Sequence, residues 1–209
     1  MRKVFDLSLY LVTDRDLSLD RDLEWIVSEA VRGGVTMVQL REKNCSTSEF
    51  IALAQRLKSA LKPYNVALVA NDRVDVVLAA DLDGVHIGQS DMSYSDARAL
   101  LGEDKIIGLS VENMTQVEDA NSLDVDYIGI SPLFATPTKT DTSEPFGLEG
   151  CRTACEISRH KTVVIGGLNK SNVKDAISSG ADGVAVVSAI VSADNPCNAA
   201  QELISLIKG

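Results

Sequence analysis

The stretch Asp83-Gly84-Val85-His86-Ile87-Gly88-Gln89-Ser90-Asp91 contains the features that decide the predicted fold. It begins with a small-residue turn, continues as a short apolar run and ends in polar residues. A short apolar run is typical of a strand in a parallel sheet that is covered on both faces. Glycine at the turn permits the left-handed conformation in which a preceding helix often ends. We therefore interpret the stretch as a helix exit, a strand and a polar loop.

The same turn and strand recur along the chain. Comparable stretches begin at Gly33, Asp126 and Ala181, and each leads into an apolar run. With the runs that lack a glycine turn, we count eight candidate strands, at residues 9–12, 35–40, 66–69, 84–87, 106–109, 127–130, 162–165 and 183–187. A helical stretch follows each candidate strand, so the sequence consists of repeated strand and helix units.

The segments between the strands have helical periodicity. Ser46 and Glu49 match a capping box, and Phe50, Leu53 and Leu57 then recur at the spacing of one helix face. Eight units in 209 residues, about 26 residues each, predict an α/β fold. We expect a single (β/α)8 TIM barrel over residues 1–209. A doubly wound open sheet is the alternative, and spacing alone does not separate the two.

Composition limits the possible partners. Thirty acidic and 20 basic residues give a net charge of −10, which argues against a nucleic-acid partner because such proteins need a basic surface. No apolar run approaches the ~20 residues that span a bilayer, and the first residues lack the core of a signal peptide. We expect a cytoplasmic protein with no membrane partner and four reduced cysteines. The oligomeric state stays open, a homo-oligomer included.

Polar residues collect where the candidate strands end, which is where barrels hold their active sites. After the second strand, Gln39, Arg41 and Lys43 alternate and therefore lie on one side. An arginine fork and a lysine point charge together suit a phosphate or diphosphate, although a surface patch of salt bridges would look the same. Asp72 and Asp91 follow the third and fourth strands. They are candidate Mg²⁺ ligands, or else helix caps.

Two further segments suit a phosphorylated ligand. The long loop after the sixth strand carries Thr136, Thr138 and Lys139, which are either phosphate contacts or a solvated turn. Gly167 follows the seventh strand, and Val187 with Ser188 follows the eighth. Backbone N–H groups at these two places form the usual phosphate site of a barrel. His86 lies within a strand, so we interpret it as a hydrogen-bonded core residue rather than as a base.

Six short segments, in this order, resemble the thiamine-phosphate synthase family. They run from the first strand to the end of the seventh, so the resemblance covers most of the chain. The similar segments are Leu9-Tyr10-Leu11-Val12-Thr13-Asp14, Val38-Gln39-Leu40-Arg41-Glu42-Lys43, Asn71-Asp72-Arg73-Val74-Asp75, Gly84-Val85-His86-Ile87-Gly88-Gln89-Ser90-Asp91, Pro132-Leu133-Phe134-Ala135-Thr136-Pro137-Thr138-Lys139 and Ile165-Gly166-Gly167-Leu168.

The resemblance implies a transferase that joins two phosphorylated heterocycles. These are 4-amino-2-methyl-5-(diphosphooxymethyl)pyrimidine and 4-methyl-5-(2-phosphooxyethyl)thiazole, and the products are thiamine monophosphate and diphosphate. Mg²⁺ is the implied cofactor, bound by Asp72 and Asp91. The residues implied to bind the pyrimidine diphosphate are Gln39, Arg41, Lys43, Asn71, Ser110 and Lys139. Those implied to bind the thiazole phosphate are Thr136, Thr138, Gly167, Val187 and Ser188.

The residues themselves suit such chemistry. Negative charge grows on diphosphate as it leaves, and Arg41, Lys43 and Lys139 with Mg²⁺ are placed to stabilise that charge. The dissociative path that the family implies needs no protein nucleophile. Two alternatives stay open: a thiazole tautomerase paralogue, which would need a histidine after the fifth strand, and a ligand-sensing barrel without catalysis. The segment Ser110-Val111-Glu112-Asn113 holds no histidine.

Overall fold

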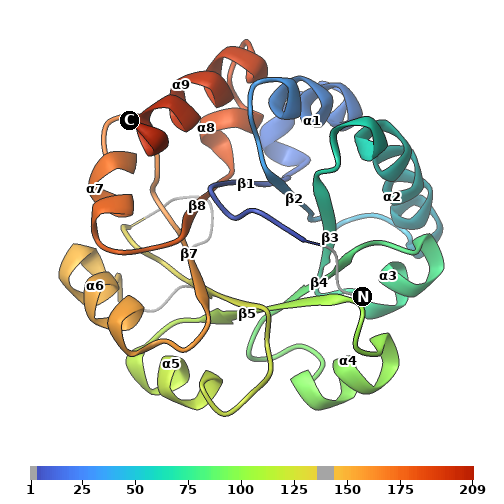
Figure 1. Ribbon diagram of the computed structural model, residues 1–209. Helices are drawn as coiled ribbons and strands as arrows, with labels where there is room; N and C mark the ends of the chain where they lie inside the picture. Colours follow the sequence, from blue (N-terminus) through green and yellow to red (C-terminus); the bar gives the residue numbers. More distant parts are fainter. Residues whose placement is uncertain (1–3, 136–143) are drawn as a thin grey trace.

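Across the residues that the structure describes, 4–135 and 144–209 of a computed structural model, eight parallel strands close into a barrel (Figure 1). Each strand pairs with the next one in sequence, and β8 pairs with β1. The strands are β1 (Leu9–Val12), β2 (Met37–Leu40), β3 (Ala67–Asn71), β4 (Gly84–Ile87), β5 (Ile106–Val111), β6 (Tyr127–Ile130), β7 (Lys161–Ile165) and β8 (Gly183–Val186). Closure confirms the predicted (β/α)8 barrel over the open sheet, because an open sheet would leave two edge strands unpaired.

The helices form a ring around the barrel, as Figure 1 shows. They are α1 (Leu23–Arg32), α2 (Thr47–Leu61), α3 (Val74–Ala80), α4 (Tyr94–Leu101), α5 (Met114–Ala120), α6 (Gly147–Ile157), α7 (Val173–Ser178), α8 (Ser188–Val191) and α9 (Pro196–Lys208), with 3-10 turns at Asp16–Ser18 and Lys62–Tyr64. The C-terminal α9 packs against α1 and so completes the ring. None of the helices in the described part of the chain has the length and apolar character of a membrane-spanning helix.

The start of α2 confirms the predicted capping box. The Ser46 side chain accepts a hydrogen bond from the Glu49 backbone N–H, and the Glu49 carboxylate accepts one from the Ser46 N–H at 2.8 Å. Phe50, Leu53 and Leu57 are buried, as the helical spacing predicts. The cap therefore sets where α2 begins, and the apolar face sets which side of it meets the barrel.

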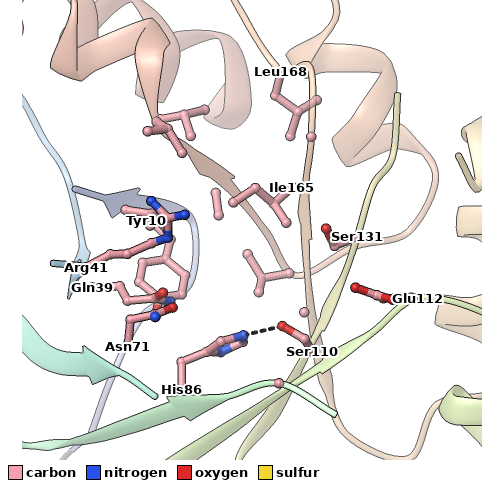
Figure 2. Close-up of a pocket in the computed structure, with 18 of the residues that line it drawn as sticks. Tyr10, Gln39, Arg41, Asn71, His86, Ser110, Glu112, Ser131, Ile165 and Leu168 are labelled. Carbon is pink, nitrogen blue, oxygen red and sulfur yellow. Dashed lines mark hydrogen bonds between the residues drawn. The ribbon is translucent and has the colours of Figure 1, made fainter. Parts of the chain in front are cut away.

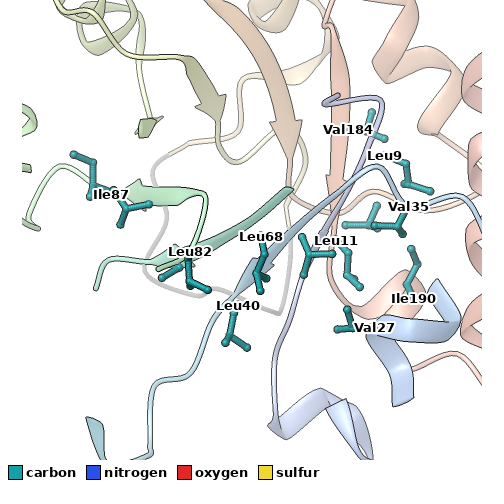
Figure 3. Packing of buried hydrophobic residues seen from close by; sticks show 14 of the residues in the cluster. Leu9, Leu11, Val27, Val35, Leu40, Leu68, Leu82, Ile87, Val184 and Ile190 are labelled. Atoms are coloured by element: carbon teal, nitrogen blue, oxygen red, sulfur yellow. The ribbon is translucent and has the colours of Figure 1, made fainter. Parts of the chain in front are cut away.

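Buried side chains form two layers because every strand is covered on both faces. The larger layer lies between the strands and the helices, where Leu11, Leu40 and Val184 of the strands meet residues such as Val27 and Ile190 (Figure 3). The smaller layer fills the barrel interior. Its buried members are Leu7, Tyr10, Val12, Met37, Ala67, Val69, Ile106, Tyr127, Val163 and Ala185.

The residue before each even-numbered strand forms a hydrogen bond with the start of the strand that precedes it in the barrel. In each case its side-chain oxygen accepts a hydrogen bond from a backbone N–H at or near the start of that strand. The pairs are Thr36 with Leu9 (3.0 Å), Asp83 with Leu68 (2.8 Å), Asp126 with Ile107 (2.8 Å) and Asp182 with Thr162 (2.8 Å). This recurring bond gives a physical reason for the repeated turn in the sequence.

These hydrogen bonds are expected to differ in strength with their burial. Asp126 also pairs with Arg98 at 3.2 Å, and the two side chains are only 7% and 10% exposed. Asp126→Ala should lower the free energy of unfolding by about 3–5 kcal/mol, because it leaves the buried Arg98 guanidinium without its carboxylate partner. Asp182 is exposed, so Asp182→Ala should cost only about 1 kcal/mol. Urea denaturation measures both, and equal losses would contradict this ranking.

Glycines in the recurring turns serve two different purposes. At the end of α1, Gly33 has a φ of −79°, and it is the next residue, Gly34, that takes positive φ, at 111°. Asp81 takes the left-handed conformation after α3, with a φ of 50°. The expectation was wrong for Gly84 and Gly183, which do not have positive φ. A Cβ on Gly84 would lie 2.0 Å from the Ile106 carbonyl oxygen, and one on Gly183 would lie 1.8 Å from a backbone oxygen. At these two positions glycine is required by the close approach of adjacent strands.

Candidate active site

A cavity of about 950 Å³ opens at the carboxyl ends of the strands. Strands and loops from all around the barrel contribute to it, and Figure 2 shows their side chains pointing inward. It is lined by ten of the residues singled out from the sequence: Gln39, Arg41, Lys43, Asn71, Asp72, Asp91, Ser110, Gly167, Val187 and Ser188. Thr136, Thr138 and Lys139 lie outside the described residues. Positions that are far apart in sequence therefore meet at one cavity.

Arg41 is held in place by the loop after β1. Its backbone N–H donates to Thr13 Oγ1 at 2.9 Å, and its guanidinium pairs with Asp14 Oδ2 at 2.7 Å. The two charged side chains are 17% and 14% exposed. Sequence reasoning did not assign a role to Thr13 or Asp14, although both belong to the polar end of the first strand. They fix the direction of the guanidinium at the edge of the cavity.

Asp72 and Asp91 form a carboxylate pair rather than two helix caps. Arg73 is the N-cap of α3 and Ser93 is the N-cap of α4, so the capping alternative is wrong for both carboxylates. Burial and the neighbouring Asp91 raise the pKa of Asp72 to about 6, while Asn71 and Arg41 act in the opposite direction. Two carboxylates that disfavour each other's charge are suited to share a cation.

Local backbone geometry holds this carboxylate pair. Asp72 has a φ of 62°, and its N–H donates to the carbonyl oxygen of His86 at 2.8 Å. The Asp91 carboxylate accepts a hydrogen bond from the Gly88 N–H at 2.7 Å. The two residues that hold the acids, His86 and Gly88, lie in or directly after β4. The pairing of β3 with β4 therefore brings the two acids together. No cluster of three or more His, Cys, Asp or Glu side chains suitable for a metal occurs among residues 4–135 and 144–209.

The opposite wall of the cavity is made by a glycine turn after β7. Gly166 and Gly167 have φ values of 113° and 67°. A Cβ on Gly167 would lie 2.9 Å from the Ala135 carbonyl oxygen, so this turn fits closely against the loop after β6. Asn172 Nδ2 donates to the Gly167 carbonyl oxygen at 2.9 Å and fixes the turn. The backbone of Gly167 therefore borders the cavity with no side chain in the way.

His86 forms part of the cavity floor and is hydrogen-bonded at both ring nitrogens. Nε2 lies 2.8 Å from Ser110 Oγ, the bond drawn in Figure 2, and Nδ1 lies 3.0 Å from the Tyr127 hydroxyl. Burial lowers the pKa of His86 to about 4, so the ring is neutral near pH 7. These contacts confirm the interpretation of His86 as a hydrogen-bonded core residue.

Several lining residues were missed by sequence reasoning. Tyr10 projects into the interior from β1, and Gln89 reaches from the loop after β4 to donate to the Ser110 carbonyl oxygen at 2.6 Å. Glu112 and Ser131 border the cavity from the ends of β5 and β6 (Figure 2). Strict alternation along the first strand would have placed Tyr10 on the inner face. The same alternation, continued from Ser110 at the end of β5, would have placed Glu112 on the inner side as well.

Comparisons with known proteins agree along nearly the whole chain. A family model described as thiamine monophosphate synthase matches residues 9–190. The chain is 50% identical over 201 residues to a thiamine-phosphate synthase of Albidiferax ferrireducens, covering 96% of this chain and 92% of that protein. It is 50% identical over 200 residues to one of Vibrio campbellii, covering 96% and 98%.

A solved structure shows the same arrangement in three dimensions. Thiamine phosphate pyrophosphorylase from Pyrococcus furiosus superimposes with a TM-score of 0.89 at 35% identity, covering 97% of this chain and 96% of that chain. The likeness therefore extends to the complete barrel and is not confined to a shared motif. The sequence matches and this barrel show that the chain belongs to the thiamine monophosphate synthase family, as a transferase of thiamine biosynthesis.

Proposed function

We propose that the chain joins 4-amino-2-methyl-5-(diphosphooxymethyl)pyrimidine to 4-methyl-5-(2-phosphooxyethyl)thiazole, releasing thiamine monophosphate and diphosphate. The observation that carries this proposal is the position of two cations beside two carboxylates. Arg41 and Lys43 line the same cavity as Asp72 and Asp91. Such a set suits a diphosphate bound together with a divalent metal. The cavity, at about 950 Å³, lies in the size range of small-molecule sites.

The cations act on the leaving group. The bond between the pyrimidine methylene carbon and the diphosphate oxygen breaks, and its electron pair leaves with the diphosphate. Arg41 and Lys43 stabilise the negative charge that grows there, as does Lys139, which lies outside the described residues. The thiazole nitrogen then donates its lone pair to the methylene carbon and forms the new C–N bond. The aminopyrimidine ring delocalises the positive charge between the two steps.

Asp72 and Asp91 are the proposed metal ligands. Their donor set, two carboxylate oxygens with space for water, fits Mg²⁺, which prefers oxygen ligands and keeps several of its waters. The raised pKa of Asp72 agrees with this assignment, because burial and the neighbouring Asp91 both disfavour a negative charge on Asp72, and a bound cation would offset that cost. When bound, Mg²⁺ would neutralise part of the diphosphate charge. Asn71, which donates a hydrogen bond to Asp72, orients that carboxylate.

The second substrate is proposed to bind on the opposite side of the cavity. Gly167, Val187 and Ser188 offer backbone N–H groups and a hydroxyl to the thiazole phosphate, together with Thr136 and Thr138 beyond the described residues. This arrangement separates the two anionic groups across the cavity. It leaves the reacting methylene and nitrogen between them, so that positioning supplies much of the rate enhancement.

A substitution at the glycine turn tests the second subsite. Gly167→Ala places a Cβ where φ is 67° and only 2.9 Å from the Ala135 carbonyl oxygen. The turn must shift, so we expect the KM for the thiazole phosphate to rise about tenfold or more. The KM for the pyrimidine diphosphate should change by less than twofold in steady-state kinetics. A rise confined to the pyrimidine KM would show that this wall serves the other substrate.

Turnover with both heterocycles tests the proposed function itself. The purified chain is incubated with the two substrates, with and without Mg²⁺, and thiamine monophosphate is measured by mass spectrometry. We expect product only when both substrates and Mg²⁺ are present. Isomerisation of the thiazole without coupling would favour the tautomerase alternative. Tight binding without product would favour a ligand-sensing barrel.

The cellular setting is part of the same proposal. A site for small phosphorylated heterocycles, with no partner of nucleic acid or membrane, suits a biosynthetic enzyme of the cytoplasm. All four cysteines are free thiols, which agrees with a reducing compartment. The net charge of −10 also opposes binding to nucleic acid.

A further inference from the structure

A chain of hydrogen bonds crosses the barrel interior directly beneath the cavity. It joins Gln39 on β2 to Ser110 on β5, and both of these end residues line the cavity. The links are Gln39 Nε2 to Tyr10 hydroxyl (2.9 Å), Tyr10 hydroxyl to Tyr127 hydroxyl (2.8 Å), Tyr127 hydroxyl to His86 Nδ1 (3.0 Å) and His86 Nε2 to Ser110 Oγ (2.8 Å). We call this set the Gln39–Ser110 chain.

The direction of these bonds is assigned by giving every buried hydroxyl proton of the chain an acceptor within it. The Gln39 amide nitrogen only donates, so the Tyr10 oxygen accepts from it. The single Tyr10 proton then goes to Tyr127, its other partner among the described residues. Tyr127 in turn donates to His86 Nδ1, which consequently carries no proton. The ring proton must lie on Nε2, where it is donated to Ser110 Oγ. The hydroxyl proton of Ser110 is then left to point into the cavity.

The barrel interior is shaped to hold the rings of this chain. A Cβ on Gly108 would lie 2.1 Å from Cζ of Tyr127, and a Cβ on Gly129 would lie 3.1 Å from Cε1 of His86. The His86 and Tyr127 rings stack at 5.5 Å, and Tyr10 meets Tyr127 edge to face at 5.9 Å. All three rings are buried, at 8% exposure or less. A fully satisfied buried network of this kind has one well-defined geometry.

We propose that Tyr10, Tyr127 and His86 are positioning residues that fix whether Ser110 and Gln39 present a hydrogen-bond donor or acceptor to the cavity. The chain makes Ser110 a hydrogen-bond donor toward the cavity, and it leaves the Gln39 carbonyl oxygen as an acceptor at the other end. A donor at Ser110 suits an oxygen of the diphosphate, whereas a serine that spent its proton on His86 would present only lone pairs to an anion. The substrate part of this inference rests on the proposed function.

The tautomer of His86 reports the direction of the chain without any substrate. The protein holds only two histidines, so long-range ¹H–¹⁵N spectra of the imidazoles resolve both. His86 should have its proton on Nε2. His160 is an internal control, because its Nε2 donates to the Ala120 carbonyl oxygen at 2.9 Å. A proton on Nδ1 of His86 in the unaltered protein would overturn the proposal. His86 would then donate to Tyr127 and accept from Ser110, which reverses the assigned hydrogen bonds.

Two substitutions separate the links. Tyr127→Phe removes the donor to Nδ1, so the His86 signals should shift toward a mixture of tautomers. Tyr10→Phe breaks the chain one step earlier and should leave the Nε2 tautomer in place, because the Tyr127 proton still has His86 as its acceptor. Tyr94→Phe is the matched control, since that hydroxyl donates to the Asp124 carbonyl oxygen outside the chain. An unchanged His86 spectrum in folded Tyr127→Phe would overturn the proposal.

Steady-state kinetics then tests whether the hydrogen-bond direction in the Gln39–Ser110 chain matters for catalysis. Tyr127→Phe should lower kcat/KM for the pyrimidine diphosphate about tenfold while the KM for the thiazole phosphate stays within twofold. In a Ser110→Ala background the same substitution should cost less than threefold, because its effect passes through Ser110. Equal losses in both backgrounds would contradict a positioning role. Absence of turnover in the unaltered protein would instead contradict the proposed function and leave the tautomer result standing.

Discussion

Arg41→Ala is expected to lower kcat/KM of the coupling reaction by about 10²–10³-fold, the effect of removing one donor aimed at charge that develops in the transition state. Arg41 borders the cavity and is already held by Asp14 at 2.7 Å. Its charge therefore needs no reorganisation when the diphosphate leaves. Because the charge grows during the reaction, most of the loss should appear in kcat rather than in KM.

Two variants sharpen the Arg41 result. Arg41→Lys keeps a positive charge but loses the planar fork, so its activity should fall between those of the alanine variant and the unaltered protein. Arg56→Ala is the matched control, because Arg56 pairs with Glu24 on the exposed surface at 3.2 Å. Its rate should be unchanged. Steady-state rates and thermal melting are measured on all three proteins, and a near-normal rate for folded Arg41→Ala would remove Arg41 from the mechanism.

Replacing both Asp72 and Asp91 with asparagine is expected to abolish Mg²⁺ binding and to reduce activity about 10³-fold. The amide oxygens carry no net charge, so the site loses the electrostatic attraction that holds a divalent cation. Isothermal titration with MgCl₂ measures binding without turnover, and rates across a MgCl₂ series measure the functional response. A normal magnesium response in the double variant would refute the metal assignment.

The melting temperature of the double asparagine variant shows whether lost activity comes from a missing metal ligand or from unfolding. The pKa of Asp72 is raised from 3.8 to about 6 in the folded protein. Its contribution to folding stability is therefore fully present below pH 3.8, where the carboxyl is protonated, and is lost as pH rises through about 6. Near pH 7.5 the charged pair therefore weakens the metal-free protein. The double asparagine variant should melt at the same temperature or higher there. Asp119→Asn with Asp194→Asn, both exposed, is the matched control and should leave activity and Mg²⁺ binding unchanged.

Much of the barrel could be predicted because its elements are set locally. Strand positions agree with the apolar runs to within two residues, and the capping box at Ser46 begins α2 as predicted. The polar residues after β2 were assigned to one side by alternation alone, and Arg41 and Lys43 do line the same cavity. Such patterns need only the backbone geometry of a few neighbouring residues.

Local sequence could not decide other features, because they depend on distant partners. Asp72 and Asp91 each have the sequence context of a helix cap, but the pairing of β3 with β4 makes them neighbours. Gly84 suggests a left-handed turn, yet it is the Ile106 carbonyl oxygen on the adjacent strand that leaves no space for a side chain there. Neither fact is contained in the residues around these positions.

The sequence by itself determined the repeating strand and helix units, the polar strand ends and the family to which they are similar. Only the tertiary structure decided that Asp14 holds Arg41 and that Asp91 disfavours the charge of Asp72. It also decided that Tyr10, Tyr127 and His86 connect two walls of one cavity. The physical reason is that periodicity depends on local backbone geometry. Hydrogen-bond direction, burial and pKa depend instead on which strands the closed barrel places side by side.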